Sequence, residues 1–551
     1  MIRSAAFLLA LAMLLGCERC DRPLRVTIDP TVRNQTIEGW GTSMIFWNLE
    51  DTAYDDPAWR RAYRDLGLNI LRININKEVL VDPSGDMAVP VKLEADLRAN
   101  VSKMRFDNPK TRVYGDMAVW LREHALEPDR VKITGAVWSP PHWMKGPTGT
   151  LQSHVLDPDV KKPTPWLSGG RTGDSIGGRL IQTPENLQQL GRYLAAWLKG
   201  FEAHYGVPVY AASIQNEVSF ENPFDSATYF LGPEGEEEQW WQYAEALEAV
   251  KKELTRQHVA TKIMGPHMSQ VGETPSNPWG LWHQMSYIEA VKAHPDSKLI
   301  DFLFAYNSNG YMGTSDDAVK MWAAYYRGKK AVPAGWARWT KAPGVEADGK
   351  PIWVSEAGGA SGAWLDGEGG SPGSGAITVA QQMHNALVHG HASAYVYWQL
   401  SDDDDEENEH TLLGNKHVKN PTESKKYAAF KHFSRYVRPG AVRIGATFSN
   451  GKSSTGGRNE YDTYRGLSVS AYLHEADGML TLVLLNMSPS DEQVRIGLPP
   501  ELSLHALQSH LTSARESFAR QPDLPVSSHQ VDLSAPAHSV ITLHGRTGRR
   551  L

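Results

Sequence analysis

Cysteine is nearly missing from this chain of 551 residues, which has 2 cysteines, Cys17 and Cys20, both close to its beginning. The rest of the chain therefore cannot form disulfide bonds, and its length allows a large hydrophobic core to stabilise it instead. Two thiols are also too few for a structural zinc site. We expect neither a metal ion nor a cofactor.

The chain also lacks an excess of basic residues. Its 56 Lys and Arg residues stand against 63 Asp and Glu residues, which leaves a formal net charge of -7. Seven of the acids form one run, Asp402–Glu409. Because nucleic-acid binding needs a basic face that neutralises phosphates, we exclude a nucleic-acid partner.

Long hydrophobic runs are missing too, apart from the first residues. Arg3 and the apolar stretch Ala5–Leu15 are typical of a signal peptide, which we assign to residues 1–16. The following Cys17 completes a sequence that resembles the lipobox of bacterial lipoproteins. We therefore predict an exported monomer, an outer-membrane lipoprotein of a Gram-negative bacterium, bound to the membrane through lipidated Cys17 alone. Ordinary secretion, or a redox or metal pair made by Cys17 and Cys20, are the alternatives.

Among the aromatic residues, the 18 Trp outnumber the 13 Phe. Trp combines a broad apolar face with one polar edge. Such faces suit the C–H surfaces of sugar rings, which makes carbohydrate a candidate partner.

Short apolar, β-branched runs alternate with helical patterns over most of the chain. Regular alternation of strands and helices indicates parallel strands, and eight such units predict a (β/α)8 TIM barrel, which belongs to the α/β class. The predicted strands are Thr36–Trp40, Ile70–Ile75, Val131–Trp138, Val209–Ile214, Lys262–Gly265, Ile300–Ala305, Ile352–Ser355 and Ala394–Gln399. The predicted helices are Pro57–Leu66, Gly115–Ala125, Pro184–His204, Gln239–Gln257, Trp282–Ala293, Asp316–Tyr326, Ala376–His389 and Ser424–Val437.

After Pro439 the apolar residues follow a period of two, and Asp477-Gly478 is a typical hairpin turn. This pattern predicts a C-terminal β-sandwich side domain. Leu24, Val26 and Ile28 alternate in the same way, so the N-terminal strand is expected to join that domain. The predicted domains are a tether with this strand in residues 17–35, the catalytic barrel in residues 36–437 and the sandwich in residues 438–551.

Two glutamates follow predicted strands of the barrel. Glu217 comes after the fourth strand and Glu356 after the seventh. Catalytic groups of such barrels come from the carboxyl ends of the strands, so these two side chains are expected to face each other across the barrel mouth. Glycoside hydrolysis needs such a pair, one carboxyl group to protonate the leaving oxygen and one to meet the developing oxocarbenium ion.

Five ordered motifs resemble a known family. Asn216-Glu217 and Ser355-Glu356 are similar to the motifs of clan A of the glycoside hydrolases, which are retaining enzymes built on (β/α)8 barrels. Three further motifs, within Ile37–Gly41, Trp138–Met144 and Phe433–Gly440, resemble glycoside hydrolase family 30. The resemblance extends over about residues 24 to 547.

The resemblance implies a role for several residues of this chain. Glu217 would be the general acid/base and Glu356 the nucleophile that forms a covalent glycosyl-enzyme intermediate. Arg72, at the end of the second strand, is the expected cation beside Glu356. Asn216 would hydrogen-bond the sugar 2-hydroxyl, and Tyr306 would donate to Glu356. A structural role is the alternative for each of them.

Five more residues are candidates for sugar binding, because they follow barrel strands. We expect Trp138, Trp143 and Trp398 to stack against sugar rings, although a Trp beside a barrel is often part of the core. His142 and Asn307 are candidates for lining subsites.

The acidic run after the eighth strand allows three interpretations: a solvated loop, a cation site, or a device for substrate selection. In each case it would repel an anionic sugar near the cleft. We therefore predict hydrolysis of a neutral β-linked glycan, namely xylan, β-1,6-galactan or β-1,6-glucan. The alternatives are an exo-acting glucosidase, xylosidase or fucosidase and a non-catalytic glycan-binding lipoprotein.

Overall fold

The structure of the chain is a computed structural model, which describes residues 23–44, 57–85, 89–146, 179–218, 226–229, 241–268, 284–311, 314, 316–328, 344–401, 410–414, 423–448 and 466–547. The predicted signal peptide, the lipidation site Cys17 and the acidic run Asp402–Glu409 lie outside these residues. The described residues divide into two compact units. One comprises residues 35–440, and the other comprises the described residues before 35 and after 440.

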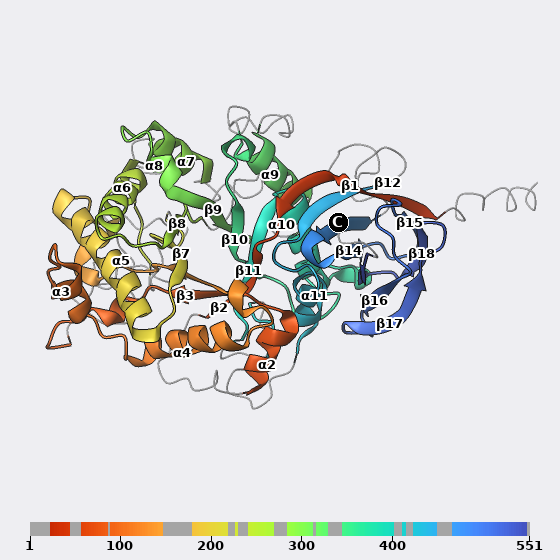
Figure 1. The fold of residues 1–551 in the computed structure, drawn as a ribbon, viewed down its shortest axis with the longest axis horizontal. Coiled ribbons are helices and arrows are strands. Elements are labelled where there is room, and N and C mark those ends of the chain that lie inside the picture. Colours follow the sequence, from red (N-terminus) through yellow and green to blue (C-terminus); the bar gives the residue numbers. More distant parts are fainter. Residues whose placement is uncertain are drawn as a thin grey trace, which may run out of the picture. The chain divides into compact units, whose positions relative to one another are not determined.

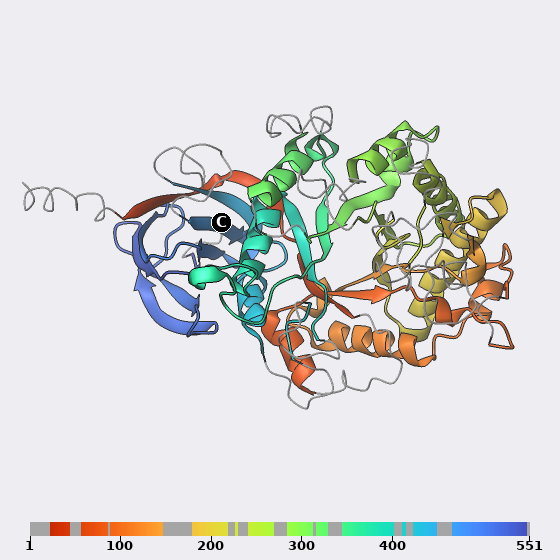
Figure 2. The ribbon, with the colours of Figure 1, turned by 180° about the vertical axis from the view of Figure 1, so that it is seen from behind.

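Eight parallel strands of the first unit form a closed barrel in the order β10-β11-β2-β3-β4-β7-β8-β9. Figures 1 and 2 show the helices of this unit outside the barrel strands. This arrangement confirms the predicted (β/α)8 barrel. The barrel strands are β2 (Gly39–Met44), β3 (Ile70–Asn74), β4 (Lys132–Ala136), β7 (Val209–Ser213), β8 (Lys262–Met264), β9 (Leu303–Asn309), β10 (Ile352–Glu356) and β11 (Ala392–Tyr397).

The helices between these strands begin and end at residues suited to those positions. In the longest one, α5, the Thr183 side chain accepts a hydrogen bond from the backbone of Asn186, and Pro184 occupies the first turn. Gly206 ends α5 with a left-handed φ of 70°, which costs glycine little. The described helices of this unit are α2 (Pro57–Leu66), α3 (Leu97–Ser102), α4 (Pro109–His124), α5 (Pro184–Tyr205), α6 (Trp241–Arg256), α7 (Gln284–Ala293), α8 (Leu299–Phe302), α9 (Asp316–Arg327), α10 (Ile377–Val388) and α11 (Lys425–Ser434).

The barrel interior is filled by side chains, with an aromatic cluster at the amino ends of the strands. Trp353 stacks on Tyr210 at 6.3 Å between ring centroids, and its indole donates to Glu38. Glu38 also forms an ion pair of 2.8 Å with Lys132. These contacts give Glu38 a structural role at the end of the barrel that is opposite to the strand carboxyl ends.

Two barrel strands are shifted by three or more residues from their predicted positions. The first barrel strand is Gly39–Met44 rather than Thr36–Trp40, because its small residues allow a close approach to β3. A Cβ atom on Gly41 would lie 2.4 Å from the Ile70 carbonyl oxygen. The sixth strand is Leu303–Asn309 rather than Ile300–Ala305, since the apolar residues before it form α8 and its second half is polar.

The second unit contains a nine-stranded sheet in the order β17-β16-β19-β14-β13-β12-β1-β15-β18. Alternating apolar side chains of these strands pack into one hydrophobic core. The expected hairpin turn joins β13 to β14, with Gly478 at a φ of 60°. The strands are β1 (Leu24–Thr36), β12 (Val442–Phe448), β13 (Leu467–His474), β14 (Met479–Asn486), β15 (Glu492–Gly497), β16 (Ala506–Thr512), β17 (Ala519–Pro525), β18 (Gln530–Ala535) and β19 (Ser539–Arg546).

The N-terminal strand β1 belongs to this sheet, as the sequence predicts. It runs parallel to β15, where Leu24 is opposite Val494 and Val26 is opposite Ile496. The side chains of Leu24, Val26 and Ile28 lie in the hydrophobic core of the unit. The domain is therefore assembled from both ends of the chain.

Candidate active site

The two predicted catalytic glutamates lie at the carboxyl ends of two barrel strands. Glu356 is the last residue of β10, and Glu217 follows β7, which ends at Ser213. Because the strands are parallel, both carboxyl ends open at the same end of the barrel. The two side chains also influence each other electrostatically.

Glu356 is held by a cation and a phenol. Arg72 Nη1 lies 2.7 Å from Glu356 Oε2, and both side chains are buried. Tyr311 donates its hydroxyl hydrogen to Glu356 Oε1 at 2.9 Å. Burial and the charge of Glu356 raise the pKa of Tyr311 well above its usual value, so the phenol remains a donor at neutral pH. Both oxygens of Glu356 thus face groups that stabilise a negative charge.

Arg72 links the two glutamate-bearing strands. Its Nη2 donates to Asn216 Oδ1 at 2.6 Å, and its Nη1 also donates to Ser43 at 3.2 Å. Asn216 directly precedes Glu217, so one guanidinium group orients the neighbour of one glutamate and binds the other. Its planar fork of donors suits this bridging role better than the single ammonium group of lysine.

Glu217 has an environment that favours the protonated form. Desolvation and the nearby charge of Glu356 raise its pKa to about 8, against the opposing effects of the Asn309 hydrogen bond and Arg72. Asn309 Nδ2 donates to Glu217 Oε1 at 2.9 Å. The backbone of Glu217 has a φ of 47°, a left-handed conformation that is uncommon outside glycine. A carboxyl group that keeps its proton at neutral pH can act as a general acid.

The predicted sugar-stacking residue Trp138 supports Arg72. The guanidinium carbon of Arg72 lies 4.3 Å from the centre of the Trp138 ring, and the ring is 5% exposed. Trp398 lies 6.1 Å from Trp138 between ring centroids and is more exposed. Trp138 therefore offers little free surface to a sugar, whereas Trp398 keeps part of its surface accessible.

His142 and Trp143 lie in the 3-10 turn η4 (His142–Met144), beyond β4. Burial lowers the pKa of His142 to about 3, with Lys77 and Lys145 adding to the effect. The His142 side chain is 1% exposed and neutral. Among the described residues, no hydrogen bond is seen between either side chain and the glutamates, so their contact with substrate stays a prediction.

Tyr306 and Asn307 do not take the positions expected from the sequence. Tyr306 donates to Asp348 Oδ2 at 2.8 Å instead of Glu356, because its side chain leaves β9 on the outer side of the barrel. Asn307 points inward, where it donates to Ser213 and Ser355. It is 1% exposed and therefore holds strands together beneath the site rather than lining a subsite.

Tyr311, Asn309 and His267 are the site residues that the sequence analysis missed. Asn309 and Tyr311 were missed because the predicted sixth strand ended four residues too early, which made Tyr306 its first following residue. A polar second half of a strand gives no hydrophobic signal. His267 follows the short strand β8, and a single histidine there carries no motif.

The two tyrosines allow a matched test. Tyr311→Phe is expected to lower kcat/KM by about 10-fold to 100-fold, since a hydrogen bond to a charged group contributes about 1.5–3 kcal/mol. Tyr306→Phe removes a hydroxyl group of the same kind from the same segment and should leave kcat/KM within about twofold. Steady-state kinetics of both variants check this, and equal losses would contradict the assignment.

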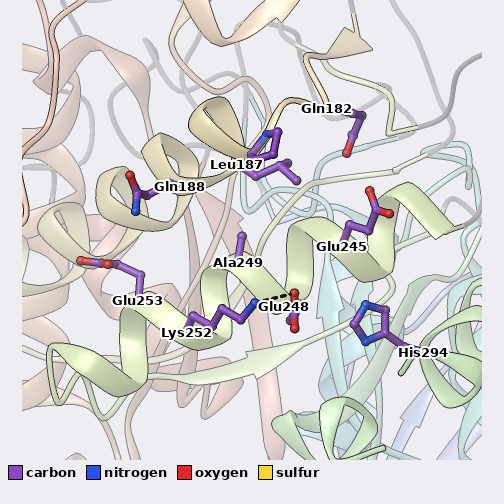
Figure 3. Close-up of a pocket in the computed structure, with 10 residues that line it drawn as sticks. Gln182, Leu187, Gln188, Glu245, Glu248, Ala249, Lys252, Glu253 and His294 are labelled. Carbon is purple, nitrogen blue, oxygen red and sulfur yellow. Dashed lines mark ion pairs between the residues drawn. The ribbon is translucent and has the colours of Figure 1, made fainter. Parts of the chain in front are cut away.

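A hollow of about 600 Å³ lies elsewhere in this unit, between α5 and α6 (Figure 3). Figure 3 shows Glu248 and Lys252 facing each other there, at 2.9 Å. None of its lining residues belongs to the glutamate site. We assign no catalytic role to it.

The described residues contain no group of His, Cys, Asp and Glu that could hold a metal ion. In the same part of the chain, no helix has the length and apolar character needed to cross a bilayer.

A (β/α)8 barrel that carries glutamates after its fourth and seventh strands is the arrangement expected of clan A glycoside hydrolases. The comparison with protein families supports the same class. Residues 440–543 match the model of the glycosyl hydrolase family 30 beta sandwich domain. This match confirms the resemblance that the motifs indicate.

Similar proteins of known activity also include glycan-cleaving enzymes. The glucuronoxylanase XynC of Bacillus subtilis (strain 168) is 29% identical over 167 residues, which are 30% of this chain and 33% of that protein. The match thus spans about a third of the relative's length. Among solved structures, a family 30 endoxylanase from Clostridium papyrosolvens C71 has a TM-score of 0.61 at 18% identity, covering 95% of this chain and 100% of the other. An endo-β1,6-glucanase has a TM-score of 0.58 at 16% identity, covering 95% and 94%. These structures establish the shared fold.

Proposed function

We propose that this chain is a retaining glycoside hydrolase that cleaves a neutral β-linked polysaccharide, with Glu217 as the acid/base and Glu356 as the nucleophile. The observation that carries the proposal is the contrast between the two carboxyl groups. Glu217 has a pKa raised to about 8, whereas Glu356 is bound by the Arg72 cation and the Tyr311 hydroxyl. One protonated and one charge-stabilised carboxyl group are the two partners of a double displacement.

In the first step, a carboxylate oxygen of Glu356 forms a bond to the anomeric carbon as the glycosidic C–O bond breaks. Glu217 gives its proton to the leaving oxygen, so the first sugar product departs as a neutral alcohol. Arg72 and Tyr311 stabilise Glu356 before the attack and again when it leaves.

In the second step, ionised Glu217 takes a proton from a water molecule whose oxygen attacks the anomeric carbon. The bond to Glu356 breaks, and its carboxylate returns to Arg72. Retention requires the two carboxyl groups to lie about 5–5.5 Å apart, which leaves no room for a water molecule to attack directly.

The negative charge of the chain favours a neutral substrate. The chain has a net charge of -7, and its run of seven acids follows the eighth barrel strand. These charges would repel a uronate side group. We therefore propose unsubstituted xylan, β-1,6-galactan or β-1,6-glucan as substrates, although one relative is called a glucuronoxylanase.

A release assay for reducing ends tests the function and the substrate together. The panel contains xylan, glucuronoxylan, β-1,6-galactan, β-1,6-glucan and aryl glycosides, with Glu356→Gln as the inactive control. We expect oligosaccharide products from one neutral polymer and at least about tenfold lower kcat/KM on glucuronoxylan, because repulsion of one charge near the site costs about 1.4 kcal/mol or more.

The other outcomes of that assay contradict parts of the proposal. Release of single sugars alone favours the exo-acting glycosidase. A preference for glucuronoxylan contradicts the neutral substrate. Binding without turnover on the whole panel favours the non-catalytic lipoprotein, although binding alone needs no glutamate with a raised pKa.

For the location we propose an exported lipoprotein that is attached to the outer membrane through Cys17. The support is the N-terminal sequence, in which an apolar stretch ends directly before Cys17. Metabolic labelling with a fatty acid should mark the wild-type protein and not Cys17→Ser. Apart from this lipid anchor and carbohydrate, we propose no partner, and a monomeric state.

A further inference from the structure

One buried histidine connects the surroundings of the two glutamates. His267 follows β8 and is 1% exposed. Its Nε2 lies 2.7 Å from Asn309 Oδ1 and 3.0 Å from Ser355 Oγ. Asn309 is the residue that donates to Glu217, and Ser355 directly precedes Glu356.

The backbone of His267 makes a second connection to the acid/base. Its carbonyl oxygen accepts a hydrogen bond of 3.0 Å from the backbone amide of Val218, the residue after Glu217. The segment that carries the histidine is therefore fixed relative to Glu217, and a change of the side chain alone leaves this backbone contact in place.

The hydrogen bonds determine which nitrogen of His267 carries hydrogen. Burial and the nearby Arg72 cation hold the pKa of His267 well below its usual value, so the ring is neutral and has one N–H group. Asn309 Oδ1 is an acceptor and lies nearer to Nε2 than Ser355 Oγ does. The ring therefore donates from Nε2.

Ser355 is compatible with this arrangement. Its hydroxyl group has an acceptor in the Ser308 carbonyl oxygen at 3.4 Å. Its oxygen accepts from Asn307 Nδ2 at 3.3 Å. The Ser355 oxygen can then also receive the hydrogen of His267 Nε2, and no two donors face each other.

We propose that His267 is a positioning residue that fixes the amide of Asn309, so that the catalytic proton of Glu217 resides on Oε2 rather than on Oε1. The inference rests on the proposed function. The reason is that the Nδ2 hydrogen of Asn309 points at Glu217 Oε1, and the carbonyl oxygen of a protonated carboxyl group is a better acceptor than its hydroxyl oxygen, so this hydrogen bond favours the proton on Oε2.

The same orientation serves both steps of the reaction. When Glu217 is ionised, Asn309 Nδ2 stabilises the charge on Oε1, and when Glu217 is protonated, the same bond remains while the proton sits on Oε2. No side chain has to turn between the steps. If the Asn309 amide were flipped, its Oδ1 would face Glu217 and accept a hydrogen bond from the protonated carboxyl group, which would direct the proton away from the substrate.

Loss of the His267 hydrogen bond should therefore affect the acid in two ways. The proton would be held by Asn309 in part of the molecules, and the ionised form of Glu217 would lose its donor. Within the part of the chain that the structure describes, the charged or titratable groups that face Glu217 are Glu356, Arg72 and Tyr311, and none of them is changed by a substitution at His267. A shift in the pH profile of a His267 variant can then be assigned to the altered position of the Asn309 amide.

Three substitutions separate this role from a structural one. His267→Gln places an amide nitrogen near the position of Nε2 and can still donate to Asn309. His267→Leu fills similar space without a donor. His267→Asn is polar but too short to reach Asn309, and it provides the second test if the leucine variant does not fold.

The measurement is kcat/KM against pH for two aryl glycosides of the hydrolysed sugar, one with a good and one with a poor leaving group. For the leucine and asparagine variants we expect a loss of about 10-fold to 100-fold with the poor leaving group, a part of the 10²–10⁴ that a general acid contributes, and a loss of less than about threefold with the good one. The alkaline limb should move to higher pH by about one unit, and glutamine should restore most of the rate.

Equal losses with both substrates, an unmoved alkaline limb, or a glutamine variant as impaired as leucine would overturn the role of His267. Glu217→Ala in the same assay separates this outcome from a failure of the proposed function. If Glu217→Ala itself shows no dependence on the leaving group, the acid/base assignment fails. If it does and the His267 variants do not, the positioning role alone fails.

Discussion

Replacement of Glu356 by glutamine is expected to reduce turnover by at least about 10⁴-fold, because loss of a nucleophile closes the covalent route. The glutamine side chain has almost the same size and shape as glutamate, so the space at the end of β10 stays filled. It carries no charge, however, and leaves Arg72 buried without its carboxylate partner. Circular dichroism should accompany the kinetics, since an unpaired buried cation also destabilises the fold.

Rescue of the Glu356→Gly variant by azide tests the nucleophile role directly. Glu356→Gly opens room for azide, which should attack the anomeric carbon and yield a glycosyl azide of inverted configuration. Recovery of activity with azide would identify Glu356 as the nucleophile. Glu368→Gln, at an exposed glutamate in the loop after β10, is the matched control and should remain fully active. Absence of rescue in a folded Glu356→Gly variant would transfer the nucleophilic role elsewhere.

Glu217→Ala should have the second largest effect, and this effect depends on the substrate. Loss of a general acid is expected to lower kcat/KM by about 10²–10⁴-fold for substrates with a poor leaving group and by about tenfold or less for activated aryl glycosides. An activated leaving group departs without a proton, so it does not need Glu217. The same loss on both kinds of substrate would contradict the acid/base assignment.

The pH profile of the wild-type enzyme tests the same residue. The pKa of Glu217 is raised to about 8, so the acid form exists below that pH and is lost as the pH rises through it. We therefore expect kcat/KM to fall above about pH 8. This alkaline limb should be absent from Glu217→Ala with an activated substrate. A limb that persists there would have to come from another group.

The fold could be predicted from the sequence because its strands and helices carry strong local signals. The apolar runs of β3 and β10 stand between amphipathic helices, and the alternation itself indicates a barrel. The position of β2 was harder to predict, since this strand consists mainly of small residues such as Gly39 and Gly41. Gly41 allows a close approach to β3 and Gly39 lies against the Asn69 side chain, and both contacts depend on residues elsewhere in the chain.

The site could be predicted in part. Glu217, Glu356, Arg72 and Asn216 lie together because each lies in or just after a strand that the apolar pattern locates well. Tyr306 was the wrong tyrosine, since β9 continues to Asn309 and Tyr306 lies within this strand on the outer side of the barrel. The exact partners of Asn309 and His267 depend on side-chain geometry that no local pattern encodes.

The parallel pairing of β1 with β15 has a consequence for the order of folding. Leu24, in β1, is opposite Val494 in β15, 470 residues further along the chain. At a synthesis rate of about 5–20 residues per second, β1 leaves the ribosome roughly 20–90 s before that partner exists. During this interval the strand has an unpaired edge, which is prone to aggregation. A chaperone that holds the newly made N-terminal segment should therefore raise the yield of folded protein more than one that acts on the finished chain.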